Sequence, residues 1–357
     1  MSEHHVTVVR LGYLEKHPNA DTLSIVKVYG GYPCLVRTAE WAEGDLAAYV
    51  PEDSLVDVTR PEFAFLAPKA KDGWARVRAV RLRGIFSMGL LVKPPRHPED
   101  GSFLAGAEVL WHEGDDVAEA LGVRKYEPPL ETASRGQDVP SPSPEPPHYD
   151  LEGLRRWMDA LQPGEPVVVT EKLHGSSGRA FVSGFLYPYR VEGGMPKRRF
   201  FHVGSHTRWK DREGTTEWAV AAREVGLREK CSSAMAAGYA FYWECIGKVG
   251  GFPYGHQRGR LGLRVFDVCH VRSRTWLAHE DLETLCKELD LLTVPVLYRG
   301  PWDPGVVLPL AEGQSTLDAS HVREGIVVRP AYDRVDLRFG RVVLKYHGEG
   351  FLVGKKR

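Results

Sequence analysis

Seven prolines lie between residues 127 and 149 and divide the chain into two parts. Proline lacks the backbone N–H that a helix interior or a central strand needs, and its ring fixes the backbone dihedral φ. Residues 127–149 are therefore predicted to form a stiff, extended linker. Residues 1–126 and 150–357 are each long enough to bury a core, so we expect two domains.

The first part consists mainly of short runs with strand character. Gly, Pro, Asn or Asp separates one run from the next. This pattern is typical of a small closed β-barrel, here with one short helix around residues 115–121. The expected strands are Val6–Val9, Leu23–Val28, Cys34–Val36, Leu46–Val50, Arg76–Val80 and Gly89–Val92.

The second part mixes helical and strand patterns without regular alternation. Leu151, Leu154, Met158 and Leu161 recur at helical spacing after Asp150, a residue type that caps helices. Further helices are expected at 216–237 and 280–289, and strands at 166–172, 239–245, 261–268, 325–329 and 341–346. The pattern predicts an α+β fold, because a doubly wound parallel sheet would alternate strand and helix.

Composition excludes several classes of protein. Apolar residues make up 43% of the chain, too many for a disordered protein, yet no apolar run reaches the roughly 18 residues of a membrane-spanning helix. The five cysteines are an odd number without a CxxC pair, which argues against a disulfide framework and a cysteine-rich zinc site. The N-terminus has no signal-peptide pattern, so a cytoplasmic protein is expected.

Charge is unevenly distributed, although the net charge is zero. Residues 1–150 hold 16 Lys and Arg against 23 Asp and Glu, whereas residues 151–357 hold 31 against 24. The second part is therefore the better candidate for binding a polyanion. The first part contains one basic series, Arg76, Arg78, Arg81 and Arg83, which a strand would present largely on one face. That face either contacts nucleic acid or is an ordinary solvated surface.

The most informative segment is VVVTEKLHGSSG, residues 167–178. An apolar strand ends at Lys172 and runs directly into a loop of glycine and serine. A lysine at the end of a buried strand is partly desolvated, which favours the neutral amine that a nucleophile needs. The small residues after it allow backbone N–H groups to approach a phosphate. A solvated lysine at a strand end is the alternative interpretation.

Four further segments follow in order, each on a predicted strand. FYWECIG sets Glu244 inside an apolar strand, where an unpaired carboxylate would be costly. RVFDV supplies Phe266, EGIVVR supplies Glu324 and Arg329, and VVLKY supplies a second lysine, Lys345. Each segment alone is common, but the ordered set is specific.

The ordered series EKLHG, FYWECIG, RVFDV, EGIVVR and VVLKY resembles the motifs of the covalent nucleotidyltransferases, which comprise RNA ligases, DNA ligases and mRNA capping enzymes. KLHG is most similar to RNA ligases of the phage T4 type 2 kind. In the first part, HPNADTL (17–23) and LRGIFSMGL (82–90) resemble signatures of tRNA-binding OB folds. The combination is similar to the Deinococcus-type RNA ligases. It implies an amino-terminal OB-fold β-barrel joined to a nucleotidyltransferase domain (ATP-grasp-like ligase) of antiparallel sheets with flanking helices.

The resemblance also implies a reaction. In such ligases the nucleophilic lysine, here Lys172, attacks the α-phosphorus of ATP, releases pyrophosphate and holds AMP as a phosphoramidate. AMP then passes to an RNA 5′-phosphate, and a 3′-hydroxyl displaces it to seal the strand. The implied partners are ATP, Mg²⁺ or Mn²⁺, and RNA as a nicked duplex or an RNA:DNA hybrid, and the expected state is a monomer that repairs RNA.

Roles for individual residues follow from the resemblance. Lys172 and Lys345 would be catalytic, and Glu324 and Glu244 would bind the metal. Nucleotide contacts would come from Glu171, Gly175, Arg208, Glu244, Phe266 and Arg329, and RNA contacts in the first domain from Arg76, Arg78, Arg81 and Arg83.

Three positions depart from the superfamily pattern. His174 stands where many members have Asp, and His347 stands where a further lysine is frequent. The Ser-Arg motif expected between the EKLHG and FYWECIG segments is not matched exactly, and Arg208 fits it only with a shift in register.

Three other functions remain possible at this stage. A GTP-dependent capping guanylyltransferase and a DNA ligase share the motifs, but both carry their OB module after the nucleotidyltransferase, and nothing of domain size follows Lys345. A non-catalytic RNA-binding protein with the same fold is the third, although both motif lysines are present.

Overall fold

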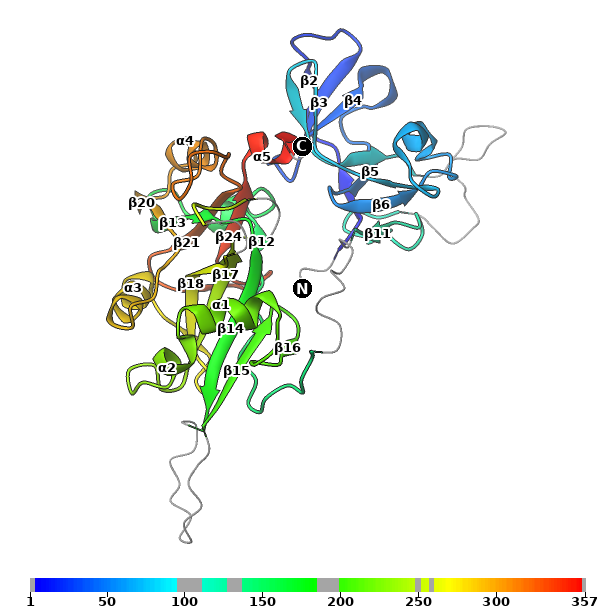
Figure 1. Ribbon diagram of the computed structural model, residues 1–357. Coiled ribbons are helices and arrows are strands. Elements are labelled where there is room, and N and C mark those ends of the chain that lie inside the picture. Colours follow the sequence, from blue (N-terminus) through cyan, green and yellow to red (C-terminus); the bar gives the residue numbers. More distant parts are fainter. Residues whose placement is uncertain are drawn as a thin grey trace. The chain divides into compact units, whose positions relative to one another are not determined.

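The computed structural model describes residues 4–94, 111–126, 137–184, 199–247, 252–256 and 260–354. Within these ranges the chain forms two compact units (Figure 1). The first contains the described residues up to 126 together with 153–158 and the residues after 351, and the second contains the rest. This division differs from the predicted one, because residues 153–158 pack with the first unit.

The first unit is built from short antiparallel strands. They form the sheets β1-β5-β10, β2-β3-β4 and β11-β6-β7 and the pair β8-β9. Strand β5 (Leu46–Val50) is buried on both faces: Ala48 and Val50 belong to one apolar cluster, and Ala47 and Tyr49 to another. Sheets on both sides of one central strand are consistent with the predicted barrel.

The other elements of the first unit have the following bounds: β1 (Thr7–Arg10), β2 (Glu15–Lys16), β3 (Leu23–Val28), β4 (Tyr32–Arg37), β6 (Ser54–Asp57), β7 (Trp74–Arg76), β8 (Val80–Leu82), β9 (Ile85–Ser87), β10 (Leu90–Val92) and β11 (Arg124–Lys125), with 3₁₀ turns at Thr38–Glu40 and Ala64–Lys69.

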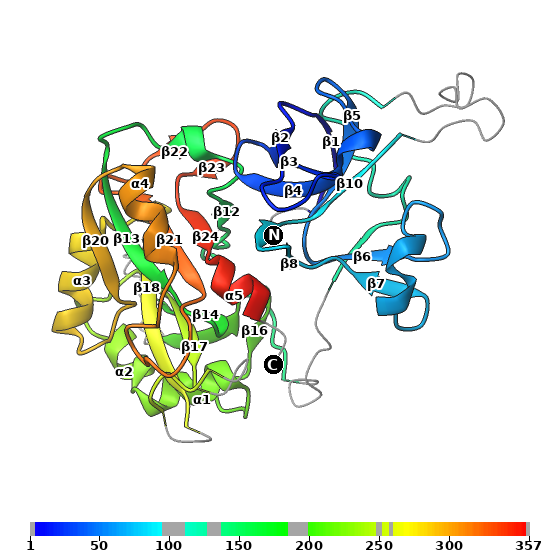
Figure 2. The same ribbon diagram turned by 90° about the horizontal axis from the view of Figure 1, so that it is seen from above.

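The second half of the chain forms two larger antiparallel sheets. One has the strand order β12-β24-β21-β13-β20 and the other β16-β15-β14-β17-β18-β19. Figure 2 shows β13, β20 and β21 side by side, as their pairing requires. Antiparallel sheets with few helices confirm the predicted α+β class.

The strands of this half are β12 (Glu152–Gly153), β13 (Pro166–Lys172), β14 (Ser176–Ser183), β15 (Phe200–Ser205), β16 (Trp209–Lys210), β17 (Tyr239–Ile246), β18 (Gly262–His270), β19 (Thr275–Trp276), β20 (Val296–Pro301), β21 (Gly325–Pro330), β22 (Val335–Asp336), β23 (Gly340–Arg341) and β24 (Leu344–His347). The helices are α1 (Glu217–Glu224), α2 (Leu227–Cys231), α3 (His279–Glu288), α4 (Pro304–Val307) and α5 (Glu349–Gly354), with 3₁₀ turns at Met158–Ala160 and Leu308–Ala311.

The main core lies on one face of the six-stranded sheet. Helices α1, α2 and α3 cover this face (Figure 1), and their apolar side chains pack on Phe241, Trp243, Val265 and other residues of β14, β15, β17 and β18. Side chains that alternate with these, such as Glu244 on β17, project from the opposite face. The site described below is built on that opposite face.

Three predicted helices differ from the structure. The helix expected at 216–237 is broken at Gly226, whose φ of 64° lies in the left-handed region. Residues 115–121 form turns, because Asp116 accepts hydrogen bonds from the backbone of Val6 and Ala118 and bridges to β1.

The predicted helix at 150–161 is also absent. Glu152–Gly153 joins the five-stranded sheet, and only Met158–Ala160 forms a 3₁₀ turn. Arg155 donates to the carbonyl of Gly31 at 3.2 Å, and a Cβ at Gly31 would lie 2.3 Å from the carbonyl oxygen of Arg155. These tertiary contacts override the helical spacing of the leucines.

The proline-rich segment is described only from residue 137 onward; residues 127–136 lie outside the described ranges. Residues 137–149 contain no helix or extended strand, as predicted, but they are not a free tether. Asp138 contacts Arg208 and Lys210, Glu145 contacts Arg179, and Tyr149 packs on Phe266. This part of the predicted linker is therefore built into the second unit.

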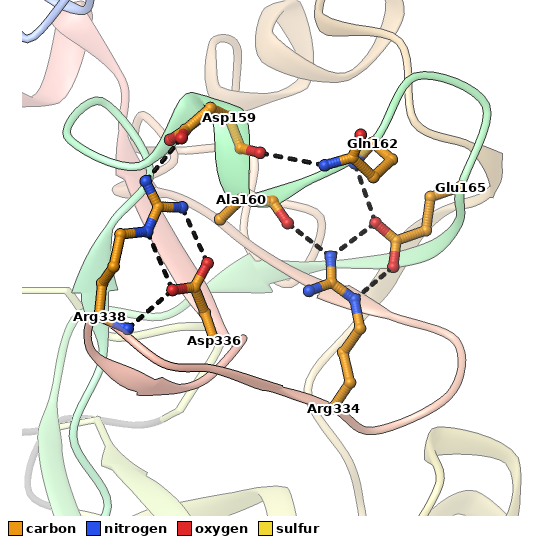
Figure 3. Close-up of polar contacts among 7 residues, drawn as sticks. All are labelled: Asp159, Ala160, Gln162, Glu165, Arg334, Asp336 and Arg338. Carbon is orange, nitrogen blue, oxygen red and sulfur yellow. Dashed lines mark hydrogen bonds and ion pairs between the residues drawn. The ribbon is translucent and has the colours of Figure 1, made fainter.

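Ion pairs hold the β22–β23 hairpin with its charged side chains bonded to the protein and its apolar side chains in solvent (Figure 3). Arg334 makes two contacts with Glu165, at 2.6 and 2.8 Å, and Arg338 contacts Asp336 and Asp159. The residues between them, Val335 and Leu337, are 66% and 102% exposed. Charge-assisted hydrogen bonds thus orient the polar side chains inward and leave the apolar ones in water.

In the described part of the chain, no helix is long and apolar enough to cross a membrane.

We predict that His279 makes stability depend on pH. Burial, together with the charges of Arg329 and Arg299, lowers the pKa of this histidine to about 4. The unfolded chain, with a pKa near 6.5, takes up the proton first, so stability is lost as pH falls below about 6.5. Between pH 8 and pH 5 the loss should be about 2 kcal/mol more for the wild type than for His279→Gln, measured by urea unfolding. Equal losses in the two proteins would contradict the assignment.

Candidate active site

The site begins at Lys172, the last residue of β13. Val167, Val168 and Val169 bury this strand between β20 and β21. Lys172 pairs with Gly325 on β21, and Gly325 pairs with His347 on β24. Directly paired residues project from the same face, so Lys172 and His347 lie on one face of the sheet, on either side of Gly325.

Glu324 is the centre of the polar contacts at this position. Its carboxylate accepts a hydrogen bond from Lys172 Nζ at 2.7 Å and lies 2.9 Å from His174 Nδ1. His347 Nε2 lies 3.4 Å from the same carboxylate. The Glu324 side chain is 8% exposed, so all three contacts act where water screens them little.

The carboxylate of Glu324 is ionised in this environment. Burial alone would raise its pKa, but Lys172, together with hydrogen bonds from His174 and His347, holds the pKa well below its ordinary value. Burial would likewise lower the pKa of Lys172, but Glu324 and Glu244 raise it above the ordinary value. The sequence-based expectation of a neutral amine is therefore wrong for the ligand-free site, where Lys172 is an ammonium ion.

Glu244 supplies a second buried carboxylate. It projects from β17 and accepts a hydrogen bond from the backbone N–H of Gly175. Burial, assisted by the nearby Glu324 and opposed by Lys172, raises the pKa of Glu244 to about 8. Two carboxylates this close share an environment in which only one is readily ionised, unless a further cation is present.

Glycines bring the backbones of the site together. A Cβ at Gly175 would lie 2.1 Å from the carbonyl oxygen of Cys245, and one at Gly325 would lie 2.1 Å from that of Tyr346. No real Cβ is found so close to an oxygen, so both positions require glycine. The loop after Lys172 can therefore lie directly against β17.

Aromatic side chains hold His174. The hydroxyl of Tyr254 accepts a hydrogen bond from the backbone N–H of His174 at 2.6 Å. The imidazole ring packs edge-on against Phe252 and Phe351, with ring centroids 4.9 and 5.2 Å away. His174 and His347, the two histidines that depart from the superfamily pattern, thus converge on one carboxylate, that of Glu324.

Phe266 and Glu171 occupy the surroundings of this cluster. Phe266 is partly exposed and packs with Tyr149, at 4.8 Å between ring centroids. Glu171 is fully buried and belongs to the opposite face of β13 from Lys172. Its carboxylate accepts hydrogen bonds from the backbone and hydroxyl of Thr316. The Glu171 side chain therefore bonds Thr316 on the face of β13 that is turned away from Lys172.

Lys345, Arg329 and Arg208 are placed differently from one another. Lys345 lies on β24, two residues before His347 and on the same face. Burial is the main cause that lowers the pKa of His347 to about 4, and the charge of Lys345 contributes to this shift. Arg329 is buried against Asp267 at 3.3 Å and donates to the carbonyl of Leu277. Arg208 lies in the turn before β16, 69% exposed and paired with Asp138 at 2.8 Å. The contacts bring Lys345 to the cluster but not Arg208.

The four arginines expected to bind RNA do not share one strand. β7 ends at Arg76, whose guanidinium pairs with Asp53 and stacks on Tyr126 at 3.8 Å. A break follows, and Arg83 has a φ of 47° in the turn between β8 and β9. The prediction of one continuous basic strand is therefore wrong. Arg78, Arg81 and Arg83 are nevertheless exposed.

The two sequence signatures of the first unit meet at this turn. Asn19 donates to the carbonyl of Arg83 at 3.2 Å, and His17 Nε2 lies 3.3 Å from the carbonyl of Leu82. The segments 17–23 and 82–90, which are far apart in the sequence, thus form one surface that carries Arg81 and Arg83.

Tyr254 and Arg179 were not anticipated from the sequence. Tyr254 belongs to the segment FPYGH, in which closely spaced aromatic residues were the available signal. Arg179 is 1% exposed on β14, paired with Glu145 at 2.9 Å and stacked on Trp209. Its partner lies in the proline-rich segment, so nothing local in the sequence indicates this contact.

The carboxylates are the candidate metal ligands. Among the described residues, no group of three or more His, Cys, Asp or Glu side chains is arranged to hold a metal by itself. Glu324 and Glu244 nevertheless offer oxygen ligands of the kind that Mg²⁺ and Mn²⁺ prefer. Such ions usually retain water and take further ligands from a bound phosphate, so two carboxylates fit this chemistry.

We predict that Gly175→Ala destabilises the protein. The added Cβ would push the loop away from Cys245 and break the hydrogen bond to Glu244. Overpacking of this kind typically costs about 1–3 kcal/mol. Urea unfolding should show this loss, whereas Gly12→Ala, at a position with nothing within 4 Å, should show no loss. An unchanged Gly175→Ala would mean that the loop does not need its close approach to β17.

Comparison with known proteins connects this geometry to a family. A family model described as RNA ligase matches residues 165–347, and one described as an OB-fold domain matches residues 5–94. These matches agree with the expected order of modules. No curated protein sequence matches the chain significantly.

Solved structures of a Naegleria gruberi RNA ligase have a similar fold along the whole chain. A variant with ATP and Mn is 24% identical, with a TM-score of 0.76 and 97% of each chain covered. A variant with AMP and Mn gives the same identity, TM-score and coverage. The complex with pyrophosphate has a TM-score of 0.76 over 98% of each chain, again at 24% identity.

Proposed function

The chain belongs to the RNA ligase family, and from this we propose that it is an ATP-dependent ligase that joins RNA 3′-hydroxyl and 5′-phosphate ends through a lysyl-AMP intermediate. The observation that carries the proposal is the cluster of Lys172, Glu324 and Glu244 beside the Gly175 loop. A lysine in contact with one buried carboxylate and close to another, next to a glycine loop that can approach a phosphate, suits nucleotidyl transfer.

In the first step the Lys172 ammonium ion releases one proton to solvent, and its neutral Nζ forms a bond to the α-phosphorus of ATP. The bond from that phosphorus to the pyrophosphate oxygen breaks, and the nitrogen loses a second proton to solvent. The RNA 5′-phosphate then takes AMP from the lysine. Finally, the RNA 3′-hydroxyl attacks the activated 5′-phosphate and releases AMP. Each step transfers a phosphoryl group, so electrostatic stabilisation near Lys172 supplies most of the catalysis.

The residues of the site have distinct proposed roles. Lys345 contacts the α-phosphate, Phe266 stacks on adenine, and Glu244 bonds the ribose. Glu171 and the Gly175 loop approach the base and phosphates with their backbones. Arg329, held by Asp267, supports the nucleotide side of the site, and Arg208 remains the weakest candidate because it is exposed and paired with Asp138.

The two carboxylates fit a hydrated divalent cation. Glu244 has a pKa of about 8 because it is buried next to Glu324, and a bound cation would relieve this repulsion. Glu324 and Glu244 would hold Mg²⁺ or Mn²⁺, which would neutralise phosphate charge and lower the pKa of Lys172. The Naegleria ligase structures that contain ATP or AMP with Mn support this assignment.

The first unit is proposed to bind RNA. Arg78, Arg81 and Arg83 are exposed, and OB folds commonly bind nucleic acid on such surfaces. Arg76 is assigned a smaller role, because Asp53 neutralises it. We propose residues 1–126 as the RNA-binding module and residues 150–357 as the adenylyltransferase, with a nicked duplex or RNA:DNA hybrid as substrate, acting as a cytoplasmic monomer in RNA repair.

Labelled nucleotide tests the first step. Protein mixed with α-labelled ATP and Mn²⁺ or Mg²⁺ should carry label after denaturation, and pyrophosphate should discharge it. Lys172→Ala should carry none, whereas Lys287→Ala, an exposed lysine on α3, should be labelled like the wild type. Label from GTP but not ATP would indicate a capping enzyme, and no label from either would favour a non-catalytic RNA-binding protein.

A sealing assay tests the substrate. The protein should join a nicked duplex whose 3′-hydroxyl strand is RNA, and Lys172→Ala should join none. Because Arg81 and Arg83 contact phosphates in this proposal, Arg81→Gln/Arg83→Gln should raise the KM for the nick about tenfold at 0.1 M salt while leaving ATP labelling unchanged. Preferential sealing of a DNA 3′-hydroxyl end would instead identify a DNA ligase.

A further inference from the structure

Arg264 is a partly buried cation without a carboxylate partner among the described residues. Its guanidinium makes one hydrogen bond, to the carbonyl of the preceding Leu263 at 3.1 Å. Burial lowers the pKa of Arg264, and no neighbouring charge offsets this effect. Removing a guanidinium from water without an anion is unfavourable, so the position is costly in the ligand-free protein.

Arg264 lies on the same face of the six-stranded sheet as Glu244 of the active site, and its charge also acts on His256. Its neighbours on β18, Leu263 and Val265, are buried on the face that the helices cover. Arg264 therefore projects from the opposite face, and it pairs in register with Glu244 on β17. Paired residues of neighbouring antiparallel strands have Cα atoms about 5 Å apart. Glu244 in turn pairs with Ser177 on β14, so the three residues form one row across the sheet.

Other arginines near this sheet are neutralised by carboxylates. Arg179 pairs with Glu145, Arg208 with Asp138, and Arg329 with Asp267. Arg208, the arginine expected to match the Ser-Arg motif, is therefore paired with Asp138 of the proline-rich segment instead. Arg264 lies on β18, next to the strand of Glu244, and makes no hydrogen bond to the Glu244 carboxylate. The guanidinium donors of Arg264 that do not bond Leu263 therefore remain available to a ligand.

We propose that Arg264 binds a phosphate group of the substrate, either in the triphosphate of ATP or at the 5′ end of the RNA. This inference rests on the proposed function, because it assigns a ligand contact within the same site. A guanidinium presents its donors in a planar fork that matches two oxygens of one phosphate, and such charge-assisted bonds are strong when partly buried. Phe266, two residues further along β18, would place the nucleotide next to this fork.

The test measures binding rather than reaction. In the full-length Lys172→Ala protein, which cannot form the covalent intermediate, the affinity for ATP is compared with that for adenosine. The affinity for a nicked RNA duplex with a 5′-phosphate is likewise compared with that for the same duplex with a 5′-hydroxyl. Each pair isolates the contribution of phosphate. The measurements are repeated with Arg264→Gln, Arg264→Lys and the matched control Arg272→Gln, an exposed arginine beyond the end of β18.

We expect Arg264→Gln to reduce the phosphate-dependent gain in affinity about tenfold or more in one of the two pairs, the loss expected for a charge-assisted hydrogen bond. Arg264→Lys should retain part of the gain, because it keeps the charge without the fork, and Arg272→Gln should retain all of it. A loss confined to the ATP pair assigns Arg264 to the triphosphate, and a loss confined to the RNA pair assigns it to the 5′-phosphate.

The inference is overturned if Arg264→Gln keeps the full gain in both pairs, as Arg272→Gln does, or if neither ligand pair shows any gain with Arg264 intact. A failure of the proposed function would be seen separately, as wild-type protein that ATP does not label. Unchanged melting temperatures of the variants would establish that the differences in affinity come from the lost contact rather than from unfolding.

Discussion

The contact between Glu324 and Lys172 determines how the rest of the active site is arranged. The carboxylate is buried, so it must be ionised and fully bonded, and Lys172, His174 and His347 supply its partners. This requirement fixes the positions of three strand ends, because Lys172 closes β13, Glu324 precedes β21 and His347 closes β24. Small side chains at Gly175 and Gly325 then allow the backbones to meet.

The same contact bears on the nucleophilic role proposed for Lys172. Glu324, with a smaller contribution from Glu244, raises the pKa of Lys172 and favours its protonated form, in which the amine has no lone pair for attack. Neutral amine forms only when the negative charge around Lys172 is reduced. The departures at His174 and His347 are therefore connected: both imidazoles bond the carboxylate that controls the protonation of the lysine.

Much of this arrangement could be predicted from the sequence, for reasons that differ between residues. β13 was predicted with its observed bounds, Pro166–Lys172, because three consecutive valines between a proline and a glycine-serine loop are a strong local signal. That Lys172, Glu244 and Glu324 belong to one site was implied by the resemblance of their segments to the nucleotidyltransferase motifs. The helices at 115–121 and 150–161 were wrong because Asp116 and Arg155 make contacts with residues more than 100 positions away.

The charged partners were the least predictable part. The guanidinium of Arg76 is neutralised by Asp53, that of Arg179 by Glu145 and that of Arg329 by Asp267, and no local pattern links these pairs. Likewise, sequence alone indicated a desolvated, neutral lysine, because desolvation by a strand end is visible in sequence but the approach of two carboxylates is not. Pairing between distant segments, rather than local propensity, decided each of these cases.

A crystal structure of the protein after incubation with ATP and Mn²⁺ tests the central claim most directly. We predict continuous density between Lys172 Nζ and the phosphorus of AMP, with Glu324 no longer bonded to that nitrogen and still held by His174. AMP bound elsewhere, or bound here with the contact between Lys172 and Glu324 intact, would contradict the account.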